Sequence, residues 1–264
     1  MCGIAGFSFS PDSTVERTLA AQALLAGIAE RGADAVGYAY RDSADIRITK
    51  IRGGASGLLE TLALPASADS ALIHVRDFTK GPPEISANNH PIRHGTVVGV
   101  HNGVIENDDA VLARHGLCRA EPDMTVDSEA IFALMQHRRH DPRSLSELRG
   151  AMAAAWLDQR DEALVFLARG RSRPLWIGRT GSEVFFASTR RALAILEAVL
   201  RTHLDVRAVR EGRFLQVEHG RIVSERRFRP RRGSSEDSSL PPVRAPREAV
   251  FCLERLAALA SAAA

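Results

Sequence analysis

The sequence has little of what marks secreted, membrane-spanning or disulfide-stapled proteins. Its 264 residues include three cysteines, Cys2, Cys118 and Cys252, an odd number at wide spacing that argues against a disulfide framework and against a CxxC metal site. No apolar run approaches the ~20 residues of a membrane helix, and no charged segment followed by an apolar one marks a secretory signal. We therefore expect a cytoplasmic protein with no membrane partner.

Lysine and aromatic residues are also scarce. Lysine occurs only at positions 50 and 80, aromatic residues make up 5% of the chain, and the net charge of +3 depends on arginine. A surface for single-stranded nucleic acid would interleave aromatic residues with a basic cluster. Because they are missing around the cluster near the C-terminus, we expect a solvated basic linker there and no nucleic-acid partner. The cluster consists of Arg226, Arg227, Arg229, Arg231 and Arg232.

What is present is a hydrophobic fraction of 45%, enough for a large buried core. A helix is expected from Ser13, whose spacing to Glu16 is that of a capping box. Helical spacing predicts further helices at 107–115, 128–138 and 190–200. Short apolar runs and alternating patterns predict strands at 2–9, 36–40, 46–48, 71–75, 96–100, 151–157, 162–168, 174–178, 183–187, 213–218 and 221–228.

The order of these elements indicates the fold class. Strands come in consecutive sets rather than alternating strictly with helices, which favours an α+β fold with mostly antiparallel sheets. Residues 230–247 are rich in Arg, Ser and Pro and predict a linker. The apolar spacing over 248–262 predicts a helix that docks on the domain or binds a partner helix. We thus expect a domain at 1–228, a linker at 229–247 and a C-terminal helix at 248–264.

A cysteine directly after the initiator methionine is the first candidate for chemistry. Removal of Met1 would expose Cys2 as the N-terminal residue. Its α-amine, with a reference pKa of ~7.7–8, would then take the proton from the thiol of the same residue, directly or through a water. Taken alone, Cys2 is better explained as a small residue at the start of a strand. The segments that follow it favour the chemical interpretation.

Six short segments resemble, in this order, the glutaminase domain of class II glutamine amidotransferases, which are N-terminal nucleophile hydrolases. The resemblance is greatest to glucosamine-phosphate synthase and amidophosphoribosyltransferase, and it spans residues 2–228. It implies a four-layer αββα sandwich of two mostly antiparallel sheets. It also implies hydrolysis of L-glutamine to glutamate and ammonia through a cysteine thioester. The segments are MCGIAGF at 1–7, ERGADAVGYA at 30–39, HVRDFTKG at 74–81, NNHPI at 88–92, HNGVIEN at 101–107 and VDSEAI at 126–131.

The resemblance assigns the catalytic roles. Cys2 is the nucleophile and carries the base, and Asn102 with Gly103 forms the oxyanion hole through a side-chain N–H and a backbone N–H. Losing one such donor typically costs about 3–4 kcal/mol of barrier. The alternative for Asn102-Gly103 is a plain turn, because this dipeptide is a strong turn signal. Both interpretations can hold if a tight turn at the strand end presents the two donors.

The resemblance also assigns the substrate-binding and supporting residues. Arg76 would hold the α-carboxylate of glutamine, for which bidentate geometry is suited, and Asp127 its α-ammonium. Without the family pattern, both would more often be surface charges or helix caps. Thr79 would line the glutamine pocket and His90 would support it. Arg31 and Gly32 would support the strand of Cys2. The spacing of His90, His94 and His101 matches no zinc signature, so we expect no metal and no organic cofactor.

Two positions depart from the family pattern. Asp77 stands where an aromatic residue is usual, and Lys80 replaces a histidine; the two side chains could pair with each other across a loop. Residues 229–264 leave no room for the synthase domain that follows in family enzymes. We therefore expect a stand-alone glutaminase whose ammonia serves a separate synthase subunit. The alternatives are an amidohydrolase acting on another γ-glutamyl amide, and an inactive module that senses glutamine or scaffolds a partner.

Overall fold

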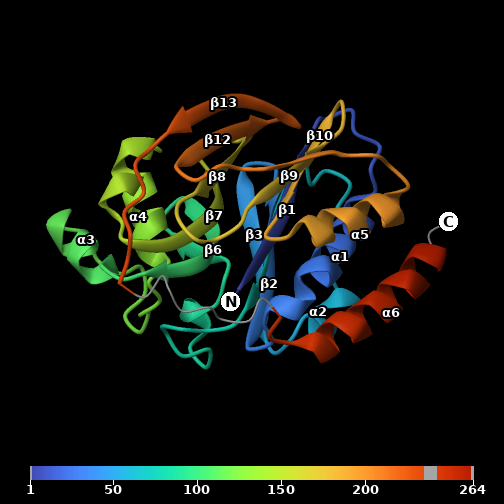
Figure 1. The fold of residues 1–264 in the computed structure, drawn as a ribbon, viewed down its shortest axis with the longest axis horizontal. Helices are drawn as coiled ribbons and strands as arrows, with labels where there is room; N and C mark the ends of the chain where they lie inside the picture. Colours follow the sequence, from blue (N-terminus) through green and yellow to red (C-terminus); the bar gives the residue numbers. More distant parts are fainter. Residues whose placement is uncertain (1, 235–242, 263–264) are drawn as a thin grey trace.

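The computed structural model describes residues 2–234 and 243–262 and shows two antiparallel sheets packed face to face (Figure 1). The first sheet has the strand order β11–β9–β10–β1–β4–β2–β3 and the second β13–β12–β8–β7–β6–β5. The first is built from β1 (Gly3–Phe9), β2 (Ala35–Asp42), β3 (Asp45–Arg52), β4 (Ser70–Arg76), β9 (Trp176–Arg179), β10 (Glu183–Ala187) and β11 (Asp205–Ala208). The second is built from β5 (Ile92–His94), β6 (Val97–Ile105), β7 (Gly150–Asp158), β8 (Leu164–Arg169), β12 (Arg213–Glu218) and β13 (Arg221–Arg227).

Helices cover the outer face of each sheet (Figure 1). The first sheet carries α1 (Arg17–Ile28), α2 (Ser56–Leu59), α5 (Arg190–Leu200) and α6 (Pro246–Ala262), and the second carries α3 (Asp108–Arg114) and α4 (Glu129–His137). Three short 3₁₀ helices, η1 (Ala29–Arg31), η2 (Ser86–Asn88) and η3 (Pro142–Glu147), complete the described elements. No helix in the described ranges is both long and apolar enough to cross a membrane. The predicted α+β sandwich of antiparallel sheets is confirmed.

Strand β1 lies in the middle of the first sheet and is buried on both faces. Ile4 contributes to the apolar layer between the sheets, together with Leu72 of β4 and Leu157 of β7. Phe7 and Phe9 face the helical layer on the other side. Because both faces are covered, all seven residues of β1 are buried, and the sequence shows a continuous apolar run instead of alternation.

The predicted start of the first helix is wrong by several residues. Helix α1 begins at Arg17, and the carboxylate of Glu16 caps it by accepting hydrogen bonds from the backbone N–H groups of Thr18 and Leu19. Ser13 instead accepts a bond from the N–H of Val15, at 3.3 Å. A capping box needs the serine at the cap and the glutamate three residues inside the helix. Here the glutamate is itself the cap.

Strand β6 does not end where the sequence suggests. It continues through Asn102 and Gly103, which pair with Ala153 and Met152 of β7, so these two residues form no turn. The backbone of Gly103 has φ +149°, and a Cβ there would lie 1.9 Å from the carbonyl oxygen of Ala151. Cross-strand pairing along the whole of β7 overrides the local turn preference, and only glycine fits against that neighbouring backbone.

The C-terminal helix docks on the domain. On α6, the side chains of Cys252 and Leu256 are buried in the cluster that also holds α1. The carboxylate of Glu248 accepts bonds from the backbone N–H and the hydroxyl of Ser56, at 2.8 and 2.9 Å. The helix begins at Pro246, two residues earlier than predicted. The division into domain, linker and helix stays a prediction.

Two short strands, β5 and β11, have no counterpart among the predicted elements. Each pairs with one neighbour only, because each lies at an edge of its sheet. An edge strand is covered on fewer sides than a central one, and β11 has no fully buried residue. Without a buried face there is no apolar alternation to identify it.

Candidate active site

Cys2 lies immediately before β1, beside the end of β4, where Gly3 pairs with Val75. Its thiol donates a hydrogen bond to the carbonyl oxygen of Asp77, with Sγ 3.4 Å from that oxygen. Burial raises the pKa of the Cys2 thiol, although the nearby Arg76 charge acts in the opposite direction. The Nε–H of Arg31 donates to the carbonyl oxygen of Cys2 at 3.4 Å. The thiol is therefore protonated at rest, and a base must remove its proton before it can attack.

Asn102 carries a buried carboxamide with no partner. Its side chain is fully buried, and neither Oδ1 nor Nδ2 has a hydrogen-bond partner among the described residues. Leaving a buried polar group unsatisfied costs about 1–3 kcal/mol. A buried carboxamide that lacks a partner in the protein is available to bind a ligand. Its N–H donors match the requirement of an oxyanion site.

Hydrogen bonds connect the two sheets next to Asn102. The ring of His74 on β4 lies 3.1 Å, through Nε2, from the carbonyl oxygen of His101 on β6. The ring of His101 in turn contacts the hydroxyl of Ser128 at 2.8 Å and the carbonyl of Ala151 at 3.3 Å. Burial lowers the pKa of both histidines to about 3, so both rings are neutral. They fix the relative position of three of the motif segments without adding charge.

Arg76, the last residue of β4, is a buried cation without a carboxylate partner in the described part of the chain. It is 2% exposed. Its Nη1 donates to the side-chain oxygen of Asn89 at 2.5 Å, and its Nη2 donates to the carbonyl oxygens of Lys80 at 2.9 Å and Gly81 at 2.5 Å. Arginine has five N–H donors, so two are available for a ligand. A buried guanidinium bonded only to neutral groups favours binding of an anion.

Asp127 is the complementary group, a buried carboxylate with no cation bound to it among the described residues. It is 3% exposed, and Oδ2 accepts a bond from the backbone N–H of Ile105 at 2.6 Å. Burial raises the pKa of Asp127 to about 6. Its negative charge is one of those that oppose the effect of burial on the pKa of Arg76. A zwitterion with one carboxylate and one ammonium matches this pair.

The structure also places three further predicted residues, Thr79, His90 and Gly32. Thr79 is exposed, in the irregular segment after Arg76. His90 is buried with its ring stacked on His74 at 4.2 Å, and burial lowers its pKa well below the usual value. Both ring nitrogens of His90 lack a hydrogen-bond partner among the described residues. A Cβ on Gly32 would lie 2.3 Å from the carbonyl oxygen of Arg76, so that position admits only glycine.

The predicted pairing of Asp77 with Lys80 is wrong. Asp77 pairs with Arg244, whose Nε lies 3.1 Å from Oδ2 of Asp77. Lys80 pairs with Asp108 at 2.6 Å and with Asp109 at 3.3 Å. Each of the two side chains therefore forms its ion pair with a residue of another segment.

Sequence reasoning also missed two asparagines. Asn89 binds Arg76, and the side-chain oxygen of Asn88 accepts bonds from the backbone N–H groups of Thr125 and Val126 at 2.8 and 3.0 Å. The NNHPI segment therefore connects the arginine to the segment that carries Asp127. The available signal was the consecutive pair of asparagines, because a carboxamide can hold backbone groups that secondary structure leaves unpaired.

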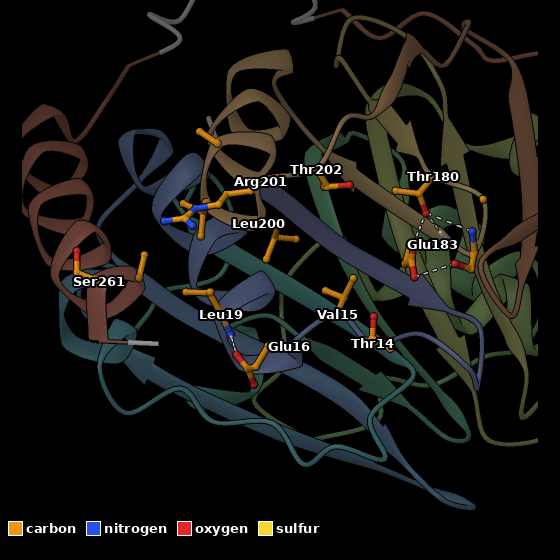
Figure 2. Close-up of a pocket in the computed structure, with 15 residues that line it drawn as sticks. Thr14, Val15, Glu16, Leu19, Thr180, Glu183, Leu200, Arg201, Thr202 and Ser261 are labelled. Carbon is orange, nitrogen blue, oxygen red and sulfur yellow. Dashed lines mark hydrogen bonds between the residues drawn. The ribbon is translucent and has the colours of Figure 1, made fainter. Parts of the chain in front are cut away.

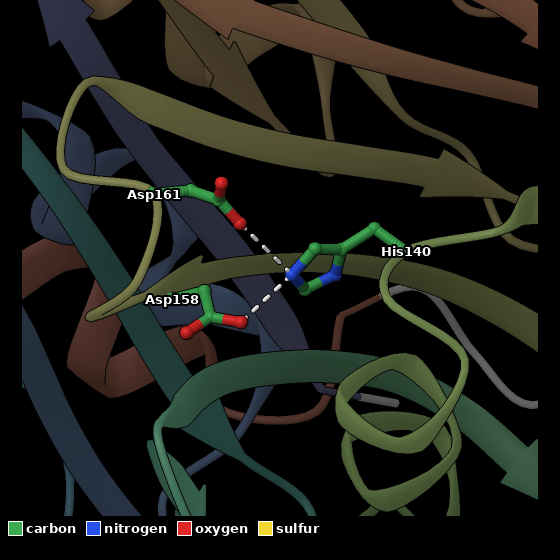
Figure 3. A group of neighbouring side chains, drawn as sticks. All are labelled: His140, Asp158 and Asp161. Atoms are coloured by element: carbon green, nitrogen blue, oxygen red, sulfur yellow. Dashed lines mark hydrogen bonds and ion pairs between the residues drawn. The ribbon is translucent and has the colours of Figure 1, made fainter.

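His140, Asp158 and Asp161 form a second polar cluster (Figure 3). Nε2 of His140 lies 2.8 and 3.3 Å from the two carboxylates. The indole N–H of Trp156 donates to Nδ1 of the same ring at 3.2 Å, which leaves the ring proton on Nε2. Arg160 binds both oxygens of Asp158. A ring proton and a guanidinium thus occupy the atoms that a metal ion would need, and the cluster is a structural ion-pair network.

A cavity of about 830 Å³ lies at another surface, between α1, α5, the turn after β9 and the end of α6 (Figure 2). Its two carboxylates already have partners. Glu16 caps α1, and Glu183 accepts bonds from Thr180 and Ser182. Because this cavity presents no buried group that lacks a partner, its size alone does not indicate a ligand.

Comparison with known proteins identifies several relatives. A family model described as glutamine amidotransferase domain matches residues 81–195. The glutamine–fructose-6-phosphate aminotransferase (isomerizing) of Halalkalibacterium halodurans is 30% identical over 190 residues, which cover 67% of this chain and 30% of that protein. The enzyme of the same name from Legionella pneumophila strain Lens is 30% identical over 263 residues, covering 92% of this chain and 42% of the relative. The chain thus spans less than half the length of these relatives.

Two solved structures share the fold. Glutamine phosphoribosylpyrophosphate amidotransferase from B. subtilis superposes with a TM-score of 0.66 at 18% identity, over 86% of this chain and 49% of that chain. A structure described as the allosteric regulatory enzyme of purine biosynthesis gives 0.65 at 20% identity, with the same coverage. The arrangement of two sheets and their helices is therefore common to these proteins.

Proposed function

This chain carries a class II glutamine amidotransferase domain with the N-terminal nucleophile hydrolase fold, and we propose that it hydrolyses L-glutamine to glutamate and ammonia. The observation that carries the proposal is the pair of buried opposite charges, Arg76 and Asp127, of which Arg76 lies near the thiol of Cys2. Neither charge has an ionic partner among the described residues. An α-amino acid supplies both missing partners in one molecule.

The proposed reaction has two steps. The α-amine of Cys2, free once Met1 is removed, takes the thiol proton, and the thiolate attacks the δ-carbon of glutamine. Asn102 and Gly103 donate to the oxyanion. The C–N bond then breaks, the amide nitrogen leaves as ammonia with the proton returned by the amine, and a γ-glutamyl thioester remains. Water, deprotonated by the same amine, cleaves the thioester, releases glutamate and restores the thiol.

The direct test is an assay of ammonia and glutamate release from L-glutamine. The protein should carry no N-terminal tag, and its intact mass should show that Met1 is absent. We expect equal amounts of the two products. A correctly processed protein that releases neither product would contradict the proposal and would favour a module that binds glutamine without turning it over.

A second candidate substrate is another γ-glutamyl amide. Asp77, in the position where the resemblance places an aromatic residue, lies beside Cys2 and has a partly exposed side chain. A substituted amide nitrogen would need room on that side. A panel of L-glutamine, γ-glutamylmethylamide and γ-glutamylanilide separates the two possibilities, since this candidate requires a higher kcat/KM for a substituted amide than for glutamine.

The fate of the ammonia is a further part of the proposal. The curated relatives are more than twice the length of this chain. We propose that a separate synthase subunit accepts the ammonia in the cytoplasm. Such a partner would raise kcat of the glutaminase when added to it, whereas a self-sufficient glutaminase would be indifferent to any candidate synthase.

Replacing Arg76 by lysine should raise the KM for glutamine about 10- to 100-fold with a smaller effect on kcat. Lysine keeps the charge but lacks the planar fork, and hydrogen bonds to charged groups are worth about 1.5–3 kcal/mol. Steady-state kinetics measures the effect. Arg52→Lys is the matched control, because Arg52 pairs with Glu84 on the exposed surface. An unchanged KM in Arg76→Lys would mean that Arg76 does not hold the α-carboxylate.

Glutamine binding should weaken as the pH falls through about 6, the pKa to which burial raises Asp127. Below that pH the carboxylate is neutral and no longer attracts the ammonium, so the Kd should rise about tenfold per pH unit. Calorimetry on the Cys2→Ala variant measures binding without turnover. Asp127→Asn should bind weakly at every pH; a pH dependence that persisted in this variant would exclude Asp127 as its origin.

The raised pKa of Asp127 also predicts how the stability of the folded protein depends on pH. A carboxyl group with a raised pKa in the folded state favours its protonated form, so folding loses stability as the pH rises from about 4 to 6 and stays lower above that. A shift from 3.8 to about 6 corresponds to about 3 kcal/mol. Asp127→Asn should therefore be more stable than the wild type at pH 8 and lose this advantage near pH 4.

A further inference from the structure

The segment Asp77–Gly81 holds the side chain of Arg76, the residue proposed to bind the substrate carboxylate. Its carbonyl oxygens at Lys80 and Gly81 receive two of the three hydrogen bonds that orient Arg76. The segment has no regular secondary structure, and Phe78 is 48% exposed within it. A segment that is open to solvent and yet positions a buried arginine needs side-chain contacts to hold it.

Lys80 provides one of these contacts. Its Nζ lies 2.6 Å from Asp108, the first residue of α3, whose side chain is 3% exposed. Arg119 also binds Asp108, at 2.8 Å, and fixes its position. An ion pair with one buried and immobile partner is worth more than a pair of mobile surface chains. This contact holds the Gly81 end of the segment against the helical layer of the second sheet.

Arg244 provides the contact at the other end. It precedes α6, and its Nε lies 3.1 Å from Oδ2 of Asp77, whose side chain is 16% exposed. The backbone N–H groups of Arg244 and Ala245 both donate to the carbonyl oxygen of Glu30, at 2.8 and 3.0 Å. Glu30 precedes Arg31, which binds the carbonyl of Cys2. The C-terminal segment is thus attached beside the nucleophile.

The backbone of Arg244 is fixed by contacts other than its ion pair with Asp77. Its backbone is bonded to η1, and α6 is anchored on the domain through Glu248 and Ser56. The backbone of Arg244 is therefore already ordered, although its side chain is 40% exposed, and only the side chain has to be ordered to form the pair. Asp77 makes a second contact, in which its backbone carbonyl oxygen accepts a hydrogen bond from the thiol of Cys2.

From these contacts we propose that Arg244, through Asp77, is a positioning residue for glutamine binding, so that the C-terminal segment completes the substrate site. This inference rests on the proposed function. It also explains why an aspartate stands at position 77, where the family pattern has an aromatic residue. The Asp77 carboxylate forms an ion pair with Arg244, which lies 167 residues further along the chain. Arg244 acts through Asp77 and the segment that follows, without contacting Arg76 or the thiol.

The test is a charge exchange measured by glutaminase kinetics on the full chain. Arg244→Gln should raise the KM for glutamine about three- to tenfold, which corresponds to about 0.7–1.4 kcal/mol, and should change kcat by less than about twofold. Arg244→Lys should restore most of the loss. The exchanged variant Asp77→Arg/Arg244→Asp should have a lower KM than Asp77→Arg alone. Arg255→Gln is the control, because Arg255 on α6 pairs with the exposed Glu60, and it should keep the wild-type KM.

A second readout does not depend on turnover. Amide hydrogen exchange of residues 77–81 should be faster in Arg244→Gln than in the wild type and unchanged in Arg255→Gln. Unchanged KM and unchanged exchange in Arg244→Gln would overturn the proposal. An inactive wild type in which Arg244→Gln still accelerates exchange would refute the glutaminase function while leaving the positioning contact intact.

Discussion

Replacing Cys2 by alanine should abolish ammonia release from glutamine and leave the protein folded. Removing the nucleophile of a covalent mechanism lowers kcat by at least about 10⁴-fold, because the remaining site can only position the substrate. The fold should tolerate the change, since the thiol makes one long hydrogen bond, to the Asp77 carbonyl at 3.4 Å. Initial rates of ammonia release and a thermal unfolding curve measure the two effects.

Two controls make this prediction specific. Cys118→Ala removes an exposed thiol and should leave the rate unchanged. An uncleavable N-terminal extension retains the Cys2 thiol but converts its α-amine into an amide, and it should be as inactive as Cys2→Ala because the base is gone. If the extended protein kept the full rate, another group would have to be the base; if Cys2→Ala kept it, the thioester mechanism would be wrong.

Asn102→Ala should lower kcat about 10²- to 10³-fold with little change in KM. The carboxamide has no partner in the described structure, and we propose that it donates to the oxyanion, a contact made most strongly in the transition state. Losing one such donor removes stabilisation from the transition state rather than from bound substrate. Steady-state kinetics with glutamine separates the two parameters.

Asn107 is the matched control for this prediction. It lies in the same HNGVIEN segment, but its side chain donates to the carbonyl of Glu147 at 2.9 Å and accepts from the N–H of Arg149 at 2.8 Å. Asn107→Ala should therefore lower the unfolding temperature and leave kcat near the wild-type value. The reverse pattern, with kcat lost at Asn107 and kept at Asn102, would place the oxyanion donor elsewhere.

Much of the fold follows from local sequence patterns. Apolar spacing along α4 and alternation along β2 and β3 predict these elements within a few residues, because both patterns are properties of the local sequence. Predictions were wrong where a distant segment decided the outcome. Asn102-Gly103 has a strong turn preference, yet it lies within a strand because β7 pairs with it along its length. One error was local: Glu16 rather than Ser13 caps α1.

The candidate site also has features that the local sequence predicts and features that only contacts between distant segments decide. The sequence alone determined the chemical groups and their order along the chain: a cysteine directly after Met1, an arginine at the end of one strand and an aspartate before a helix. Only the tertiary structure decided which charges have partners. Asp77 pairs with Arg244, whereas Arg76 and Asp127 are buried without an ionic partner in the described chain. Burial and pairing depend on which distant segments meet, and no local pattern records that.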